Sequence, residues 1–311
     1  METKILKGNA LQEKVLSEVK NEIIKLNKGY NKIPGIAFIG FLGVPLGKYN
    51  IPLHVQMAEG LGFHVFTEIK PENVTEDDLF DLIEKLNKNK DIHAIVLLQP
   101  LPTHLNSVRI TNRIDPDKEV EGFHPQNMIG TLIPDIQTNK YPMCLPTALL
   151  ELFKSNSIQI QKDKEWVLIL DDEFFSNPLV NMVARTAFIK AVPDDCALTF
   201  VNKNSQKLVE HCKRADYLVV VTKNPEYIQA EWLKKGVCII DIYSNLVKEI
   251  PSKKDPNRLV PIIRGGVNVD AVKNIAGAIL PIPGGLMSMV LAILFRNALI
   301  SFKNSLTEII K

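Results

Sequence analysis

The sequence has few cysteines and almost no excess of basic over acidic side chains. The 311 residues include four cysteines, at positions 144, 196, 212 and 238. They form no CxxC pair and have no histidine at ligand-like spacing, so we expect neither a disulfide framework nor a metal site. Thirty-seven basic side chains stand against 35 acidic ones. This balance gives no electrostatic reason to expect a nucleic-acid or membrane partner.

We expect neither a leader peptide nor a membrane-spanning run. The first residues, METKILKGNALQEK, are charged from the start, unlike a signal peptide or an arginine-rich transit sequence. The longest apolar stretch near the C-terminus, Leu286–Phe295, is too short to cross a bilayer. With the scattered cysteines, these features lead us to expect a soluble protein of a reducing compartment, most simply the cytoplasm.

Length and hydrophobic patterning predict two α/β domains. A chain of 311 residues is long for a single domain. In the first half, apolar runs such as Ile36–Leu42 and Ile92–Leu98 alternate with segments of helical spacing such as Ala10–Leu26 and Leu53–Leu61. The runs show little polar alternation, which is typical of strands covered on both faces. The alternating order predicts a parallel sheet with right-handed crossovers.

The second half repeats this alternation and predicts a Rossmann-like domain. Its expected strands are Trp166–Leu170, Ala197–Val201, Tyr217–Thr222, Val237–Ile242 and Leu259–Ile263, and its expected helices include Leu179–Lys190, Leu208–Lys213 and Tyr227–Lys234. A final apolar helix, Leu286–Phe302, is expected to return to the first domain. We therefore expect an N-terminal domain of residues 1–147 plus 287–311 and a C-terminal domain of residues 148–286, with a cleft between them.

Four segments carry a more specific signal. They are LLQPLPTHL at 97–105, IDPDKEVEGFHPQNMIG at 114–130, ADYLVVVTKNPEYIQAEWLKKGVCIIDI at 215–242 and ILPIPGG at 279–285. In this order they resemble the bifunctional methylenetetrahydrofolate dehydrogenase/methenyltetrahydrofolate cyclohydrolases of one-carbon folate metabolism. The resemblance covers nearly the whole chain. It implies a folate derivative held by the first domain, NADP held by the second, and a homodimer.

The resemblance also places the catalytic positions of the first domain. The family's cyclohydrolase lysine falls on His54, and its tyrosine, one helical turn earlier, falls on Asn50. His54 is either a replacement base or an ordinary hydrogen-bonded helix histidine, and we favour the second interpretation. The family's supporting glutamine falls on Leu98, so Gln99 could replace it only if the strand bulges there. We favour a polar strand-end residue.

Two further segments match the family's substrate-binding positions. Its pterin-binding aspartate falls on Glu121, which keeps a carboxylate on a longer side chain. The alternative is a turn acid paired with Lys118, and both interpretations stay open. The ILPIPGG segment keeps Pro283, Gly284 and Gly285 of the family's substrate-binding loop.

The cofactor half departs from the family pattern. Where the family has GRSxxVGxP after the first strand, residues 170–178 read LDDEFFSNP, without either glycine. Asp171 stands at the arginine position, and Asp172 follows it. Acids here would repel a cofactor phosphate. Lys203 and Lys223 could attract one, but lysines at strand ends are usually solvated.

Three hypotheses follow for the function. The first is a catalytically impaired or inactive relative, or pseudoenzyme, that retains the fold. The second is an active NAD(P)-dependent dehydrogenase, cyclohydrolase or both, with altered residues. The third is a protein that binds another small ligand. We favour the first, because the departures gather at reactive positions while the scaffold motifs persist.

Overall fold

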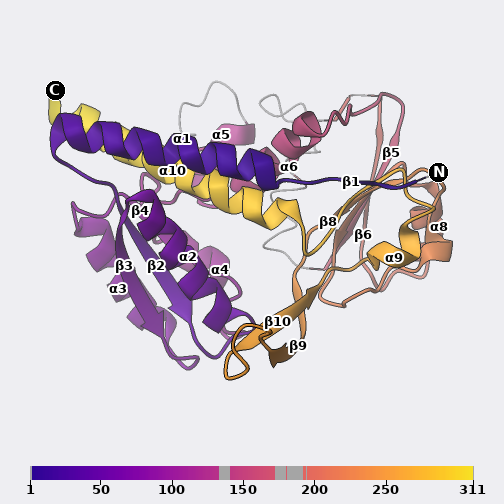
Figure 1. Cartoon of the computed structure of the whole chain (residues 1–311), viewed down its shortest axis with the longest axis horizontal. Coiled ribbons are helices and arrows are strands. Elements are labelled where there is room, and N and C mark those ends of the chain that lie inside the picture. Colours follow the sequence, from indigo (N-terminus) through magenta and orange to yellow (C-terminus); the bar gives the residue numbers. More distant parts are fainter. Residues whose placement is uncertain (1, 133–140, 172–179, 181–191, 194, 311) are drawn as a thin grey trace. The chain divides into compact units, whose positions relative to one another are not determined.

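The computed structural model describes residues 2–132, 141–171, 180, 192–193 and 195–310. The chain divides into two compact units. The N-terminal unit comprises Glu13–Cys144 and Leu291–Lys311, and the C-terminal unit comprises Met1–Gln12 and Leu145–Val290. Each unit contains a parallel sheet with helices packed against it (Figure 1), so the predicted two-domain α/β fold is confirmed.

The sheet of the N-terminal unit has the order β3-β2-β4. Its strands are β2 (Gly35–Phe41), β3 (His64–Lys70) and β4 (Ala94–Leu97), and all pairs are parallel. Strand β2 is buried over its whole length, as its continuous apolar run predicts. A parallel bridge between Ile95 and Glu119 lays the segment around Glu119 along the outer side of β4. The carboxyl ends of β2, β4 and this segment therefore lie at one edge of the sheet.

Local sequence signals account for the helices around this sheet. The helices are α1 (Asn9–Tyr30), α2 (Gly47–Leu61), α3 (Glu76–Lys88), α4 (Ser107–Thr111) and α5 (Pro125–Leu132). Thr75 and Asp78 form a capping box at the start of α3, and Gly62 ends α2 in the left-handed conformation. Helix α2 begins at Gly47, earlier than predicted, and continues through Pro52. Pro52 lies past the first turn of α2, where a proline removes one backbone hydrogen bond and crowds the carbonyl of the residue four positions earlier.

The last helix, α10 (Gly285–Ile310), returns to the N-terminal unit, as predicted. It lies beside α1 (Figure 1), where Lys303 pairs with Glu22 at 2.9 Å. The fully buried Asn297 amide donates to the carbonyl oxygens of Val120, at 2.8 Å, and Pro142, at 2.9 Å. These two bonds fix the backbone next to Glu121.

The apolar segment in α10 is longer than the stretch Leu286–Phe295 that the sequence suggested. The segment Gly285–Thr307 has a mean hydropathy of 1.7 over its most apolar window, long and apolar enough to cross a membrane. In the structure 72% of that window is buried. A helix that is apolar on all sides and buried in this way is typical of a protein core.

The C-terminal unit has a six-stranded parallel sheet with the order β1-β11-β8-β7-β5-β6. Its strands are β1 (Lys4–Ile5), β5 (Glu165–Leu170), β6 (Ala197–Val201), β7 (Tyr217–Val221), β8 (Cys238–Asp241) and β11 (Ala278–Leu280). Strand β6 lies on one side of β5, whereas β7 and the later strands lie on the other. In sheets of this kind, ligands bind outside the carboxyl ends of the strands, where the order reverses. We call the carboxyl ends of β5, β6 and β7 the switch point.

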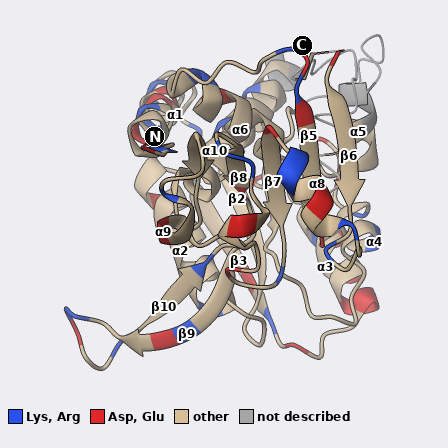
Figure 2. Cartoon of the chain, turned by 90° about the vertical axis from the view of Figure 1, so that its right-hand side faces the viewer, with Lys and Arg blue, Asp and Glu red and all other residues tan. Residues whose placement is uncertain are grey.

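Two predicted elements of this unit are wrong in part. The segment Tyr227–Lys234 is not an α-helix, because Ile228 forms an extended bridge with Val267 and only a 3-10 turn, η1 (Ala230–Trp232), follows. The strand predicted at Leu259–Ile263 exists as β10 (Leu259–Arg264), but it pairs antiparallel with β9 (Asn245–Pro251). Figure 2 shows this hairpin extending away from the six-stranded sheet.

The described residues of this half contain three other α-helices. They are α6 (Cys144–Ser155), α8 (Leu208–Arg214) and α9 (Val269–Val272). The predicted helix Leu179–Lys190 lies outside the described residues, apart from the helical residue 180.

The role of Asn297 gives a stability prediction. We expect Asn297→Asp to lower the free energy of unfolding by about 3 kcal/mol or more, because a buried carboxylate replaces a donor opposite two carbonyl oxygens. Asn21→Asp on the exposed face of α1 is the matched control and should change it by less than about 0.5 kcal/mol. Urea denaturation followed by circular dichroism measures both. Equal effects in the two variants would show that the Asn297 amide is not structural.

Candidate functional site

Four predicted site residues lie at one edge of the N-terminal sheet. Asn50 and His54 are on α2, the helix after β2. Gln99 lies just after the end of β4, and Glu121 lies two residues after Glu119, which bridges to β4. The Asn50 side-chain amide approaches the Gln99 carbonyl oxygen at 3.5 Å. No hydrogen bond joins Glu121 to the other three in the part of the chain that the structure describes. The carboxyl ends of parallel strands are the usual place for a ligand.

His54 is held in a defined protonation form. Its Nδ1 lies 2.7 Å from the carbonyl oxygen of Asn50, and a carbonyl oxygen can only accept, so Nδ1 carries the proton. Burial lowers the pKa of His54, although this hydrogen bond opposes the shift. The buried Phe38 ring meets the imidazole edge-on, with centroids 5.7 Å apart. The neutral imidazole therefore keeps a lone pair on Nε2, which suits a base.

Gln99 does not occupy a strand bulge. Strand β4 ends at Leu97, and the chain leaves the sheet before Gln99. The side-chain nitrogen of Gln99 is buried and has no hydrogen-bond partner among the described residues. An unpaired buried donor costs about 1–3 kcal/mol, and the role of Gln99 in the site stays a prediction. A ligand acceptor would remove this cost.

Glu121 is not paired with Lys118, so that alternative is wrong. The Lys118 ammonium donates to the carbonyl oxygens of Leu86, Asn87 and Asn89, at 3.2, 2.6 and 2.8 Å, and thereby caps the end of α3.

The neighbour of Glu121 is the buried carboxylate of Glu119. That carboxylate accepts backbone N–H groups of Glu121, at 2.9 Å, and His124, at 2.8 Å. Burial, and then the negative charge of Glu119, raise the pKa of Glu121 to about 8. At neutral pH Glu121 is therefore protonated and can both donate and accept a hydrogen bond.

The glycines of the ILPIPGG segment meet backbone atoms within the C-terminal unit. A Cβ on Gly284 would lie 2.2 Å from the carbonyl oxygen of Pro281, and one on Gly285 would lie 2.3 Å from the nitrogen of Gly8. Close backbone packing thus requires both glycines. A substrate contact of Pro283, Gly284 and Gly285 stays a prediction.

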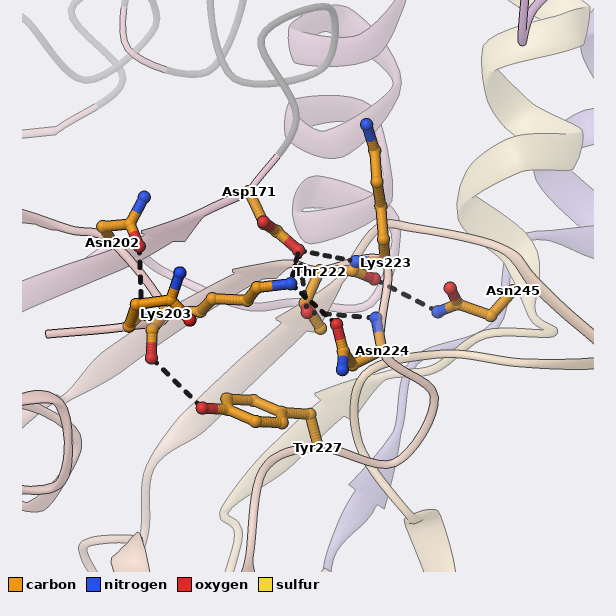
Figure 3. Close-up of polar contacts among 9 residues, drawn as sticks. Asp171, Asn202, Lys203, Thr222, Lys223, Asn224, Tyr227 and Asn245 are labelled. Carbon is orange, nitrogen blue, oxygen red and sulfur yellow. Dashed lines mark hydrogen bonds and ion pairs between the residues drawn. The ribbon is translucent and has the colours of Figure 1, made fainter. Parts of the chain in front are cut away.

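At the switch point of the C-terminal unit, an ion pair joins the ends of two strands (Figure 3). Asp171 directly follows β5, and Lys203 follows β6. The Oδ2 atom of Asp171 lies 2.7 Å from the Lys203 ammonium. From the end of β7, the same oxygen accepts the Lys223 backbone N–H at 3.0 Å and the Thr222 hydroxyl at 3.3 Å.

Further hydrogen bonds hold the Lys203 side of this cluster. The ammonium of Lys203 also donates to the side-chain oxygen of Asn224 at 2.7 Å, and the Tyr227 hydroxyl donates to the Lys203 carbonyl at 3.1 Å. The side chains of Lys203 and Asp171 are 20% and 14% exposed. The expectation that Lys203 is an isolated, solvated lysine is therefore wrong.

The charge state of Asp171 follows from the same contacts. Burial opposes its ionisation, but the hydrogen bonds from Lys203 and the Lys223 N–H, with the lysine charge, leave the pKa of Asp171 below its usual value. Asp172, the next predicted cofactor-site position, lies outside the described residues.

The hydrogen-bond donors at the switch point already pair with Asp171. An ammonium, a backbone N–H and a hydroxyl converge on one carboxylate oxygen, and these are the groups that would hold a phosphate oxygen. The described residues therefore do not fit the phosphate-binding mode that the family resemblance implies.

One buried acid of this unit was missed from the sequence. Asp241, at the end of β8, accepts the backbone N–H groups of Gly266 and Val267 at 3.0 Å each. A Cβ on Gly265 would lie 2.0 Å from Oδ2 of Asp241, so the glycine makes room for the carboxylate. Burial raises the pKa of Asp241 to about 7. The available signal was a single acid inside the apolar run VCIIDI.

Family models match both halves of the chain. Residues 6–121 match the catalytic domain of tetrahydrofolate dehydrogenase/cyclohydrolase, and residues 143–306 match its NAD(P)-binding domain. The chain is 36% identical to the Bifunctional protein FolD of Desulfosudis oleivorans over 97% of its own length and 98% of the relative's. It is 33% identical to that of Desulfatibacillum aliphaticivorans over 97% and 98%.

Solved structures share the fold. The Trypanosoma brucei methylenetetrahydrofolate dehydrogenase-cyclohydrolase, complexed with NADP and an inhibitor, has a TM-score of 0.84 at 24% identity and covers 98% and 99% of the two chains. A 5,10-methylenetetrahydrofolate dehydrogenase of the silkworm Bombyx mori has a TM-score of 0.77 at 26% identity and covers 99% and 100%.

The raised pKa of Glu121 predicts a pH-dependent stability. In the folded chain Glu121 stays protonated up to about pH 8, whereas the unfolded chain releases this proton near 4.5. Between these values the folded state binds more protons, so the contribution of Glu121 to stability falls as the pH rises. A shift of this size is worth about 4 kcal/mol at about pH 8, so replacing Glu121 by Gln should raise Tm there by roughly 10 °C and change it little at about pH 4.5.

Thermal unfolding at several pH values measures this effect, with Glu18→Gln on the exposed face of α1 as the control. A Tm difference between Glu121→Gln and the unaltered chain that does not depend on pH would contradict the assignment.

Proposed function

Because this chain belongs to the tetrahydrofolate dehydrogenase/cyclohydrolase family, we propose that it is a member whose NADP-dependent dehydrogenase step is impaired or absent. Its ligand is then a folate derivative of one-carbon metabolism, bound in the N-terminal unit. By the family resemblance we further propose a cytoplasmic homodimer.

The observation that carries this proposal is the ion pair at the switch point. A dinucleotide brings phosphate charge to this place in the fold. The Asp171 carboxylate lies there within 2.7 Å of Lys203, and it would repel that charge while it occupies the donors. The absence of both glycines from residues 170–178 also removes the close backbone approach that phosphate binding uses.

The N-terminal unit supports a second candidate, retained cyclohydrolase activity. Hydrolysis needs a water and a base but no hydride acceptor, so it does not depend on the dinucleotide. His54 keeps a lone pair on Nε2, and the buried Gln99 donor lacks a partner among the described residues. We propose His54 as the base, Asn50 and Gln99 as neighbouring polar groups, and Glu121 as the group that binds the pterin ring.

A titration with NADP and with NAD tests the main proposal. We expect no saturable thermal shift of the unaltered chain up to about 1 mM of either dinucleotide, because the phosphate donors are occupied internally. A relative that carries the GRSxxVGxP turn is the positive control. Saturation at micromolar concentration of either dinucleotide refutes the proposal.

Cyclohydrolase activity tests the second candidate. If His54 is the base, His54→Ala should lower kcat about 100-fold or more and leave KM nearly unchanged. His104→Ala is the matched control, since the Nε2 of His104 also contacts a backbone carbonyl, that of Val74, at 2.9 Å. His54 is not the base if His54→Ala keeps the cyclohydrolase activity of the unaltered chain. The same conclusion follows if the unaltered chain has no cyclohydrolase activity.

A further inference from the structure

Three hydrogen-bond donors around Asp171 already have the arrangement of an oxyanion-binding site. They come from the ends of β6 and β7, and the Asp171 Oδ2 atom lies where they meet: Lys203 Nζ at 2.7 Å, Lys223 N at 3.0 Å and Thr222 Oγ1 at 3.3 Å. A backbone N–H, a hydroxyl and an ammonium aimed at one point are the groups that bind phosphate and sulfate oxygens. Figure 3 shows them surrounding the carboxylate.

Each donor is held by contacts that do not involve Asp171. The backbone of Lys203 is fixed by the Tyr227 hydroxyl, and its ammonium has Asn224 as a second partner. The Thr222 carbonyl accepts the Asn245 amide at 3.1 Å, which fixes the turn that presents the Lys223 N–H. The arrangement should therefore persist when the carboxylate is removed.

We propose that Asp171 is a built-in anion that occupies a phosphate-binding site of its own chain, and that removing its carboxylate opens this site to inorganic phosphate. The inference rests on the proposed function, because it explains how the dinucleotide site is closed. It goes beyond that function because it assigns a phosphate-binding site to Lys203, Thr222 and the Lys223 N–H. Loss of the side chain leaves the Lys203 charge without its 2.7 Å counter-ion and leaves space for an oxyanion.

The experiment is a titration of the full chain with inorganic phosphate at constant ionic strength, followed by calorimetry and by ³¹P line broadening. Asp171→Ala should bind phosphate with a Kd at least about tenfold lower than the unaltered chain, since charge-assisted hydrogen bonds are the strong ones. Asp171→Asn, which keeps the shape but not the charge, should fall between the two. Adding Lys203→Ala to Asp171→Ala should abolish the gain.

A second aspartate supplies the matched control. Asp216 pairs with Lys234 at 2.7 Å and accepts the Glu165 N–H at 3.0 Å, so it resembles Asp171 in charge and contacts. It lies before β7, at the amino end of the sheet, where this fold does not bind ligands. Asp216→Ala should therefore gain no phosphate affinity.

Each result decides the inference. Tighter phosphate binding by Asp171→Ala but not by Asp216→Ala supports it, and equal binding by the two variants overturns it. If Asp171→Ala does not fold, Asp171→Asn takes its place, and binding no tighter than that of the unaltered chain overturns the inference. The proposed function fails separately, through micromolar dinucleotide binding by the unaltered chain.

Discussion

The contact between Asp171 and Lys203 occupies the switch point of the C-terminal unit. The pair joins the ends of β5 and β6 at 2.7 Å, and the hydroxyl and N–H groups at the end of β7 close around the same oxygen. The order of strands in the sheet makes this the place where a ligand would approach. An internal carboxylate at this position accepts from the same kinds of donor that bind a phosphate oxygen.

The N-terminal unit shows the opposite condition. Its polar groups at the sheet edge are not mutually satisfied: the Gln99 amide nitrogen has no partner among the described residues, and His54 keeps a lone pair on Nε2. The buried Asn297 amide binds the Val120 carbonyl before Glu121, and the Glu119 carboxylate accepts the Gly122 N–H after it, so the backbone is held on both sides of Glu121. Unsatisfied groups on a rigid backbone suit ligand binding. The two units therefore differ: polar groups at the edge of the N-terminal sheet lack partners among the described residues, whereas those at the switch point pair with one another.

The sequence predicted what depends on local signals. Continuous apolar runs such as Ile36–Leu42 predicted buried strands, and helical spacing in Ala10–Leu26 and Leu53–Leu61 predicted α1 and most of α2. Contacts between segments far apart in the chain could not be predicted this way. Asp171 and Lys203 meet only because β5 and β6 are neighbours, and Lys118 turns to the end of α3 instead of to Glu121. For the same reason, the expected strand Leu259–Ile263 carried no signal of its antiparallel pairing with β9.

The central claim is that Asp171 and Lys203 are energetically coupled and so keep the switch point closed. A double-mutant cycle with Asp171→Asn, Lys203→Met and the double variant, measured by urea unfolding, tests it most directly. The two side chains are 14% and 20% exposed, so we expect a coupling free energy of about 1 kcal/mol or more, above that of most exposed ion pairs. A coupling free energy near zero would mean that the contact does not hold the site closed, and would contradict the account.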